Sequence, residues 1–576
     1  MSIVSTLAGE VRHRAYRLAY EIEVFNAAPR IPPDRLAAAD SGELMSWFRE
    51  AWSERDFGES ARIGEILWAR GRLRPGDVYR LRRALTLLGR ADEALAMIQQ
   101  DAVAPFDLVT LVKAGRMRDA RGKFADLDPS VEPDTVALIR RALSEMADPD
   151  EAWNAETGAL AAALELGCGD LAADLATESL KRATPVPPRL EPAMELLHAS
   201  FRLAGRAAAG RLLEAIGALF AAEDRPAWQA VGRLAAGELD DGPVMEATAQ
   251  DRIRFGLAYL LTSACAALGR PDAAIRRLCN FDHLDLRGTE HLAELARLVG
   301  AAEGLAPRYA APSGRRRIFD VFPFNGEFML LDLKLAAMAD WVDAFVLVEA
   351  PWTFTDKPKP LYFQQAKERY ASWAHKIVHL VAEEPPAFVQ SAWSREYHQR
   401  DQGVRGLSGL CAPQDLVLIS DVDEIVDPAA VEGFGQPYAT LGMRSFQYFL
   451  NFERVGLPRQ ERKAGVVEAR ILQASGLSGL RVGMWAYSRR RVPDAGWHFS
   501  YVLTPEDAEL KTQSYSHEEH QQPQARSLHA RAIEQIRAGQ PYSPQFARVP
   551  IDSSFPEVLQ KRPEAFAQFI LAEPES

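Results

Sequence analysis

Apolar side chains in roughly the first 305 residues recur at helical spacing, with few runs of β-branched residues. This pattern predicts a succession of amphipathic helices. A short phrase recurs there, in which an apolar helix is followed by Gly-Arg, a small residue, Asp and Ala. The fullest copy spans Leu85–Leu95, and echoes lie at 114–116, 204–206 and 268–275. Glycine suits a left-handed helix end and aspartate suits the start of the next helix, so the phrase predicts a helical hairpin.

This phrase resembles the turn between the two helices of a tetratricopeptide repeat. The distances between its copies are not multiples of one period. They therefore predict a degenerate, tetratricopeptide-like array of helical hairpins without a fixed repeat number. A plain all-α domain whose turns happen to use Gly-Arg is the alternative.

The pattern changes after a linker at residues 306–316, where prolines and glycines gather. Short β-rich runs then alternate with helical stretches. We predict strands at 318–321, 344–348, 377–381 and 415–420, and helices at 327–338, 363–373 and 393–410. This alternation is typical of an α/β fold with a largely parallel sheet. The predicted organisation is a helical domain at 1–305, the linker, and an α/β domain at 317–576.

Composition and charge narrow the function classes. The net charge of −12 argues against a nucleic-acid binder, because phosphate backbones attract basic surfaces. The four cysteines lack metal-ligand spacing and are interpreted as buried residues in a reducing compartment. Charges at Glu10, Arg12 and Arg14 argue against a signal peptide. The longest uncharged stretch, 255–269, is too short for a transmembrane segment, so we expect a cytoplasmic protein.

The segment from Leu416 to Ile425 carries the candidate chemistry. An apolar strand leads into the sequence Ser-Asp-Val-Asp-Glu at 420–424. Residues i and i+2 of an extended chain point to one side, so Asp421 and Asp423 offer two oxygen ligands to one spot. Such a pair suits Mg²⁺ or Mn²⁺ bridging a diphosphate, at the strand end where parallel sheets bind ligands. Taken alone, the pair could equally be a solvated strand end.

Several blocks around this segment occur in a fixed order. They are Phe324–Lys334, Val342–Glu349, Lys357–Phe363, Ile419–Ile425 and Ala495–Ser500, followed by Lys511–His517. In this order the stretch 318–539 resembles glycosyltransferase family 17. The resemblance implies a GT-A fold, a UDP-GlcNAc donor, Mn²⁺ and inversion at the anomeric carbon.

Three positions depart from the family pattern. Asp332 and Lys334 stand where Glu and Arg are usual, which leaves the donor sugar open. Asp401 stands where the family usually has Asn after Gln-Arg.

The D-x-D pair and the family resemblance together assign candidate binding residues. The metal ligands are expected to be Asp421, Asp423 and, later in the sequence, His498. Contacts with the nucleotide sugar are assigned to Glu349, Lys357, Arg400, Asp421 and His517, with Lys359 as a further diphosphate contact. The alternatives are a core histidine at 498, a helix-capping or ion-paired carboxylate at 349, and solvated lysines.

An inverting transfer needs a general base near the acceptor hydroxyl, typically a carboxylate. The candidates are Glu424, Asp320 and Glu327, with Glu453 as a fourth. Glu424 adjoins the metal pair, but on an extended strand it points away from both aspartates. It is therefore also a candidate anchor of the loop.

The sequence thus predicts a metal-dependent inverting glycosyltransferase that moves a sugar, GlcNAc, to a glycan or protein acceptor. The helical domain is the candidate binder of the acceptor or of a partner. One alternative is a transferase for a cell-surface polysaccharide precursor with another UDP-sugar. The other is a non-catalytic helical scaffold with an inactive transferase domain.

Overall fold

The computed structural model describes residues 3–25, 29–31, 33–54, 56–98, 104–114, 116–124, 163–164, 169–182, 190–220, 228–229, 271–279, 289–455, 460–488, 490–516 and 528–572. The chain divides into two compact units, Met1–Phe281 and Asp282–Ser576, which are described separately. None of the helices within these ranges combines the length and the apolar character needed to span a bilayer.

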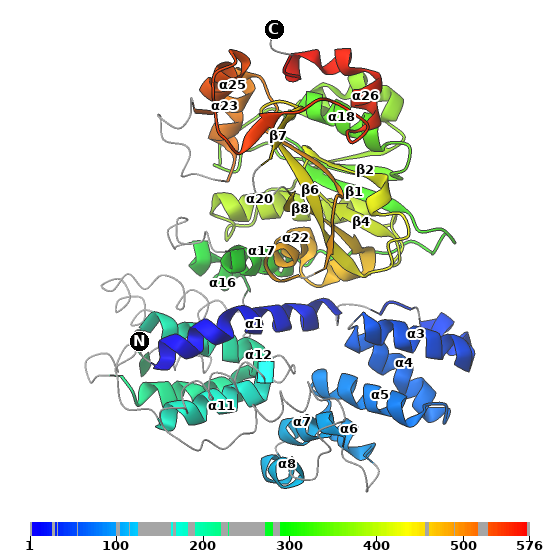
Figure 1. Ribbon diagram of the computed structural model, residues 1–576, viewed down its shortest axis with the longest axis vertical. Helices are drawn as coiled ribbons and strands as arrows, with labels where there is room; N and C mark the ends of the chain where they lie inside the picture. Colours follow the sequence, from blue (N-terminus) through cyan, green and yellow to red (C-terminus); the bar gives the residue numbers. More distant parts are fainter. Residues whose placement is uncertain are drawn as a thin grey trace. The chain divides into compact units, whose positions relative to one another are not determined.

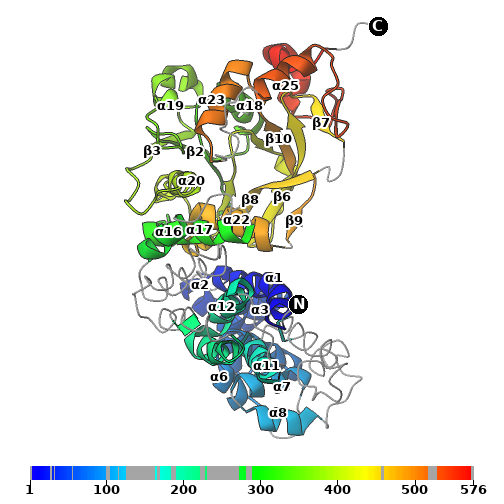
Figure 2. The same ribbon diagram turned by 90° about the vertical axis from the view of Figure 1, so that its left-hand side faces the viewer.

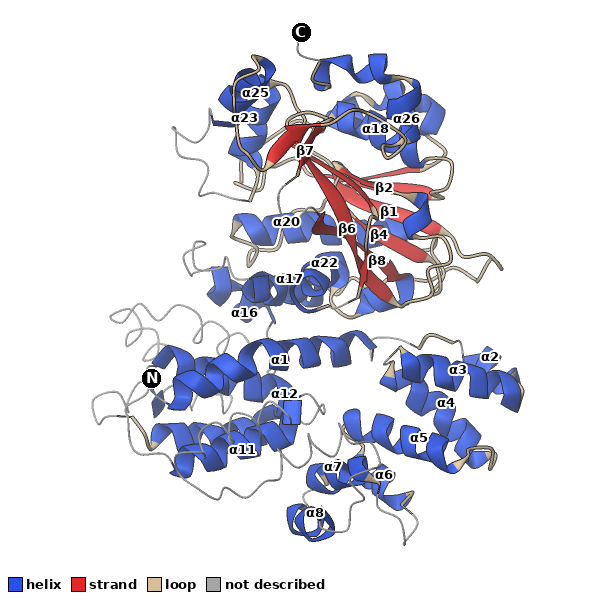
Figure 3. Cartoon of the chain, in the orientation of Figure 1, coloured by secondary structure: helices blue, strands red, loops and turns tan. Residues whose placement is uncertain are grey.

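Every element described in the first unit is a helix (Figure 3). They are α1 (Ile3–Phe25), α2 (Pro33–Ala38), α3 (Ser41–Ser53), α4 (Phe57–Ala69), α5 (Pro75–Leu87), α6 (Ala91–Ala96), α7 (Pro105–Lys113), α8 (Met117–Phe124), α11 (Gly169–Arg182), α12 (Leu190–Gly217) and α16 (Pro271–Cys279). Each helix from α3 to α8 packs against the next, and α12 packs against α1 and α11. The helical prediction is confirmed for this part, while the tetratricopeptide-like repeat stays a prediction.

The Gly-Arg phrase ends helices where it is described. Gly89 follows α5 with a left-handed φ of 80°, and α6 begins two residues later at Ala91. Gly205 has a φ of 73° and interrupts α12. A glycine tolerates this conformation because it has no Cβ, which explains the turn chemistry. Gly115 and Gly269 lie outside the described residues.

One mixed sheet organises the second unit (Figures 1 and 2). Its strands are β1 (Ile318–Pro323), β2 (Ala344–Glu349), β3 (Ile377–Val381), β4 (Leu416–Ile419), β5 (Glu424–Val426), β6 (Tyr438–Gln447), β7 (Phe452–Arg454), β8 (Gln460–Glu468), β9 (Arg491–Val492), β10 (Gly496–Ser500) and β11 (Phe546–Arg548). The order is β11-β7-β6-β8-β4-β1-β2-β3, and β10 pairs with β5 and β6. The neighbours β4, β1, β2 and β3 are mutually parallel, which confirms the predicted parallel core. The assignment to the GT-A fold stays a prediction.

Helices cover both faces of this sheet. They are α17 (Thr289–Glu303), α18 (Phe328–Met338), α19 (Tyr362–Gln365), α20 (Ala392–Asp401), α21 (Gly403–Leu407), α22 (Gly476–Tyr487), α23 (Pro505–Ser514), α25 (Leu528–Arg537) and α26 (Glu557–Lys561). Figure 1 shows α20 and α22 on one side of the sheet and α18 and α26 on the other. The helix α17 packs against α20 and α22, although the sequence places it in the helical domain. The predicted boundaries at 305 and 317 stay predictions.

Two predicted helices differ from the structure. The stretch 363–373 holds the short α19 and a 3₁₀ segment, Lys367–Trp373. The stretch 393–410 holds two helices, α20 and α21, with a turn between them. Gly403 explains the close approach of α21, because a Cβ there would lie 2.4 Å from a Val321 methyl group. The glycine therefore lets this helix rest directly on β1.

Parallel pairing brings the carboxyl ends of three core strands to one edge of the sheet. β1 ends at Pro323, β2 at Glu349 and β4 at Ile419. The segments after these strands therefore meet, and they include the Asp421 to Asp423 pair. The chemistry expected from the sequence lies at this edge.

Candidate functional site

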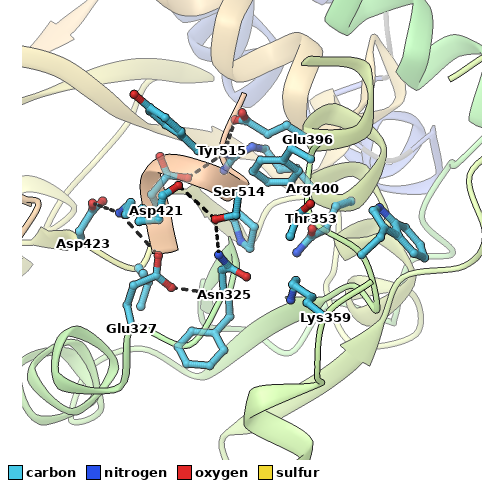
Figure 4. A pocket seen from close by; sticks show the side chains of 17 residues that line it. Asn325, Glu327, Thr353, Lys359, Glu396, Arg400, Asp421, Asp423, Ser514 and Tyr515 are labelled. Carbon is cyan, nitrogen blue, oxygen red and sulfur yellow. Dashed lines mark hydrogen bonds and ion pairs between the residues drawn. The ribbon is translucent and has the colours of Figure 1, made fainter. Parts of the chain in front are cut away.

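The carboxyl edge of the sheet holds a cavity of about 160 Å³, here called the first cavity (Figure 4). Segments after β1, β2 and β4 line it, together with α20 and the end of α23. Its polar lining includes Asn325, Glu327, Thr353, Lys359, Glu396, Arg400, Asp421, Asp423, Ser514 and Tyr515. Carboxylates and cations thus converge on one space, which is a common property of binding sites for charged ligands.

Two arginines hold Asp421. Arg400 on α20 donates to one carboxylate oxygen at 2.7 Å, and Arg481 on α22 donates to the other at 2.7 Å. Burial raises the pKa of Asp421, but the charges of Arg400 and Arg481 outweigh burial and keep this pKa well below its ordinary value. Asp421 is therefore an anion with both oxygens already bonded, and its partner Arg400 lines the first cavity beside it.

Glu424 secures the same loop from the inside. Its carboxylate accepts the Asp421 backbone N–H at 2.9 Å and two bonds from Arg481, at 2.8 and 2.9 Å. The residue is buried, and it is absent from the described lining of the first cavity. These contacts match the loop anchor that the sequence leaves open as the alternative to a catalytic Glu424.

A buried ion pair lies below the loop. Lys334 on α18 lies 2.9 Å from Asp320 on β1, and both side chains are fully buried. Lys334 also donates to the backbone oxygens of Asp421 and Glu424, at 3.1 and 2.7 Å. Burial raises the pKa of Asp320, and the Lys334 charge opposes that shift. Asp320 thus supports the loop through Lys334 and, being fully buried, offers no oxygen to a substrate, so its predicted role as general base does not agree with this geometry.

Asp423 and His498 form the part of the site that could hold a metal ion. β10 pairs with β5 so that His498 lies opposite Glu424, and His498 Nε2 comes within 3.9 Å of Asp423 Oδ1. Two ligands that each lie about 2.1 Å from one ion are at most about 4.2 Å apart. These atoms therefore fit a shared divalent cation. Potential ligand atoms of Asp423, Glu424 and His498 all lie within 4.8 Å of one another.

This group overlaps only in part with the predicted metal ligands. Asp423 and His498 come together as expected, whereas Glu424 takes the third place and Asp421 is held by arginines instead. Since both Glu424 oxygens accept from Arg481, we consider Asp423 and His498 the better-placed ligands.

A lysine bridges two carboxylates at the wall of the first cavity. Lys511 Nζ on α23 lies 3.3 Å from Asp423 Oδ2 and 3.5 Å from Glu327 Oε1. Burial lowers the pKa of Lys511, but the charges of Asp423 and Glu327 outweigh burial and raise this pKa above its ordinary value. The ammonium therefore stays charged between these two acids, 5.6 Å from the centre of the Tyr501 ring.

Sequence comparison connects this geometry with known proteins. The profile of glycosyltransferase family 17 matches residues 307–565. This part of the chain is a glycosyltransferase family 17 domain. The predicted family and enzyme class are thereby confirmed for these residues.

The family 17 domain has curated relatives in mammals. A 243-residue stretch is 28% identical to the beta-1,4-mannosyl-glycoprotein 4-beta-N-acetylglucosaminyltransferases of Homo sapiens and Rattus norvegicus, and 27% identical to that of Mus musculus. The similarity covers 36% of this chain and 44% of each relative, so the chain spans less than half of the proteins it matches. No solved structure shows significant similarity to the chain.

Two polar groups of the family 17 domain point to a ligand in the first cavity. Lys359 Nζ and Trp352 Nε1 are buried atoms on its wall with no hydrogen-bond partner among the described residues. Burial lowers the pKa of Lys359 below its ordinary value. An unpaired buried cation is costly, and an anionic ligand would relieve that cost. Of the two lysines in its block, Lys359 is therefore the one placed to meet an anionic ligand in the first cavity.

The other predicted donor contacts are placed differently. Lys357 is exposed and is not among the residues that line the first cavity. Glu349 is buried, accepts the Phe363 and Gln364 backbone N–H groups at 2.7 and 3.1 Å, and lies 2.9 Å from His379. These contacts are those of the helix-capping and ion-paired carboxylate named as the alternative. His517 lies outside the described residues.

Sequence reasoning missed Arg481, the residue that joins Asp421 to Glu424. A signal for it does exist, because Arg481 is the single charged residue of the otherwise apolar helix α22. A lone charge in such a helix usually has a buried partner. Glu396, which lines the first cavity 3.3 Å from Arg400, was missed as well.

Proposed function

We propose that the family 17 domain is a metal-dependent inverting glycosyltransferase that moves GlcNAc from UDP-GlcNAc to a glycan or protein acceptor. The observation that carries the proposal is the convergence of Asp423 and His498 with Lys359, Arg400 and Lys511 around one site. A nucleoside diphosphate needs both kinds of group, a ligand set for a divalent cation and cations for its oxygens. The names of the mammalian relatives support the choice of donor sugar.

The metal-binding residues in this proposal are Asp423 and His498. A bound Mn²⁺ or Mg²⁺ would neutralise charge on the departing diphosphate. Arg481 and Glu424 hold the loop that carries Asp423, so the position of that carboxylate is fixed before a ligand arrives. Lys359 and Lys511 supply positive charge on the walls of the first cavity.

Glu327 is the general base in this mechanism. Of the four candidates from the sequence, it alone lines the first cavity, whereas Asp320 and Glu424 hold the loop and Glu453 is bound by Arg444 at 2.8 Å. The acceptor hydroxyl oxygen attacks the anomeric carbon while its proton passes to the Glu327 carboxylate. The bond from the anomeric carbon to the diphosphate oxygen breaks, and the configuration inverts. The products are the nucleoside diphosphate and the glycosylated acceptor, and the proton of the acceptor hydroxyl remains on Glu327.

In this proposal the helical unit selects the acceptor or a partner. Arrays of helical hairpins often present extended surfaces for binding, which supports the assignment by analogy. Lys334 stands where the family usually has Arg, which leaves the donor sugar open. Its ammonium binds Asp320 and the backbone of the loop, however, and lies away from the first cavity. It therefore gives no reason to prefer another UDP-sugar.

The test is UDP release by the purified full chain with a panel of UDP-sugars, with Mn²⁺ or with EDTA. We expect release from UDP-GlcNAc with Mn²⁺, and a loss of at least about 100-fold with EDTA or in Asp423→Ala. Glu432→Ala, at an exposed position of the same unit, is the control and should keep full activity.

Release only from another UDP-sugar would favour the alternative of a polysaccharide-precursor transferase. No UDP binding with Mn²⁺ by calorimetry would instead indicate a non-catalytic scaffold. Equal activity with EDTA or in Asp423→Ala would refute the metal assignment.

A further inference from the structure

A second cavity, of about 540 Å³, lies in the same unit and shares no lining residue with the first. Asp340 and Trp341 line it, between the end of α18 at Met338 and the start of β2 at Ala344. This cavity therefore lies toward the amino end of β2, whereas the first cavity lies at the carboxyl ends of the strands. Neither the family assignment nor the proposed reaction gives it a role.

Aromatic side chains form part of its wall. Trp341, Trp497 and Phe555 all line the second cavity. Trp497 is held in place, because its indole N–H donates to the Ser554 carbonyl at 3.0 Å. Trp497 precedes His498 on β10, and successive side chains of a strand point to opposite faces. The second cavity thus lies across β10 from the proposed metal ligands.

Trp341 supplies a hydrogen-bond donor that is not used by the protein. Its Nε1 atom is buried and has no hydrogen-bond partner among the described residues. Buried indole N–H groups normally find an acceptor, because an unmade hydrogen bond is unfavourable. An oxygen atom of a ligand in the second cavity would satisfy this donor.

The polar part of the lining is mixed in charge. Asp340, Asp427 and Glu557 provide carboxylates, while Lys561 and Arg562 provide cations. Glu557 and Lys561 neutralise each other at 2.5 Å. The mixture disfavours a strongly charged ligand such as a nucleotide, and it offers both acceptors and donors to hydroxyl groups.

We propose that the second cavity binds a neutral saccharide. A sugar ring has an apolar face of C–H groups, which suits indole and phenyl rings, and a rim of hydroxyls, which suits carboxylates and an N–H donor. Trp341 Nε1–H donates to a ring or hydroxyl oxygen, and the carboxylates accept from hydroxyls. The saccharide is either a remote part of the acceptor glycan or a free sugar.

Calorimetric titration of the full chain with chitobiose, mannobiose and maltose tests this proposal, with UDP and Mn²⁺ both absent and present. Trp341→Phe removes the donor and keeps an aromatic ring, and Asp340→Asn changes an exposed carboxylate of the lining. Trp485→Phe, at a Trp that is 46% exposed on α22, is the matched control. Thermal melts of each variant verify folding.

We expect at least one disaccharide to bind, with affinity about fivefold weaker or more in Trp341→Phe and Asp340→Asn and unchanged in Trp485→Phe. UDP should not compete. A saccharide that alters the rate of UDP-sugar hydrolysis acts as a free effector, whereas an unchanged rate identifies an anchoring site for the acceptor glycan.

Three outcomes would overturn the proposal. They are no binding of any of the three disaccharides, binding that Trp341→Phe and Asp340→Asn leave unchanged, and competition by UDP, which would place the sugar in the first cavity. Because the titration measures binding directly, a failure of the proposed transferase activity would not produce any of these results.

Discussion

Arg481 donates to Asp421 at 2.7 Å from a helix sixty residues farther along the chain. The same guanidinium binds Glu424 at 2.8 and 2.9 Å. One partly buried cation therefore sets the shape of the loop that presents Asp423 to the first cavity. The D-x-D pair depends on this contact, although no motif of the family resemblance includes it.

Arg481→Gln should unfold the domain more easily and abolish transfer. Asp421 would keep Arg400, but the buried Glu424 would lose its cation, and leaving a buried charge without its partner costs about 3 kcal/mol. Thermal melting and UDP release measure both effects. Arg405→Gln is the control, because Arg405 is half-exposed and pairs with the exposed Glu383. A variant with unchanged melting temperature and activity would contradict the anchoring role.

His498→Ala should weaken the affinity for Mn²⁺ more than it lowers the stability of the fold. Losing one of two closely placed ligands should raise the Mn²⁺ concentration for half-maximal UDP release by at least about tenfold. His375→Ala, at an exposed histidine, should leave it unchanged. If both variants have the same Mn²⁺ dependence, His498 is a core histidine, as the sequence leaves open.

Glu327→Gln tests the general base. The glutamine keeps the size of the side chain but does not accept the acceptor proton, so kcat should fall by about 10²–10⁴. The donor KM should change little. Glu396→Gln, another carboxylate on the wall of the first cavity, should keep kcat within about tenfold of the native value. If kcat in Glu327→Gln is no lower than in Glu396→Gln, Glu327 is not the base.

Lys359→Met and Lys357→Met form a matched pair. The two lysines are two residues apart, but only Lys359 is placed on the first cavity. A charge-assisted hydrogen bond contributes about 1.5–3 kcal/mol, so loss of Lys359 should weaken UDP binding by about tenfold or more. Calorimetry should show Lys357→Met within about twofold of the native protein. Comparable losses of UDP affinity in both variants would show that the lysines act only through their overall positive charge and not through a contact made by Lys359.

The parallel core and the acidic loop could be predicted because both are local in sequence. Strands β2, β3 and β4 appear as short apolar runs, and Asp421 and Asp423 come shortly after β4. Roles that depend on the direction in which a side chain points could not be predicted from the local sequence. Glu349 ends β2 as expected, yet its carboxylate turns back to cap α19 instead of facing a nucleotide.

Long-range contacts were also beyond the sequence. Asp320 meets Ser420 because β1 pairs with β4, a hundred residues later, and Lys334 reaches the same carboxylate from α18. A carboxylate in a strand can equally face a cavity or a buried lysine, and only the packing of α18 decides between them. The departure at Lys334 is explained by the same contact, since an ammonium reaches Asp320 and two backbone carbonyls at once.

Asp401 gives the domain a pH-dependent stability. It is buried on α20, where it accepts the Ser478 backbone N–H at 2.7 Å. Burial raises its pKa from 3.8 to about 7, and the nearby Glu303 adds to the shift while Arg400 opposes it. Between about pH 4 and 7 the folded protein keeps a proton that the unfolded chain releases. Stability therefore falls as the pH rises through this window and is level above it.

Asp401→Asn, the residue usual in the family, should remove this dependence. The amide oxygen still accepts from Ser478 but does not ionise, so at pH 8 the variant should be more stable by up to about 4 kcal/mol. The difference from the native protein should shrink toward pH 4. Melting curves from pH 4 to 8 measure it, with Glu432→Gln as an exposed control. Parallel curves for Asp401→Asn and the native protein would show that Asp401 is ionised in the fold throughout this range.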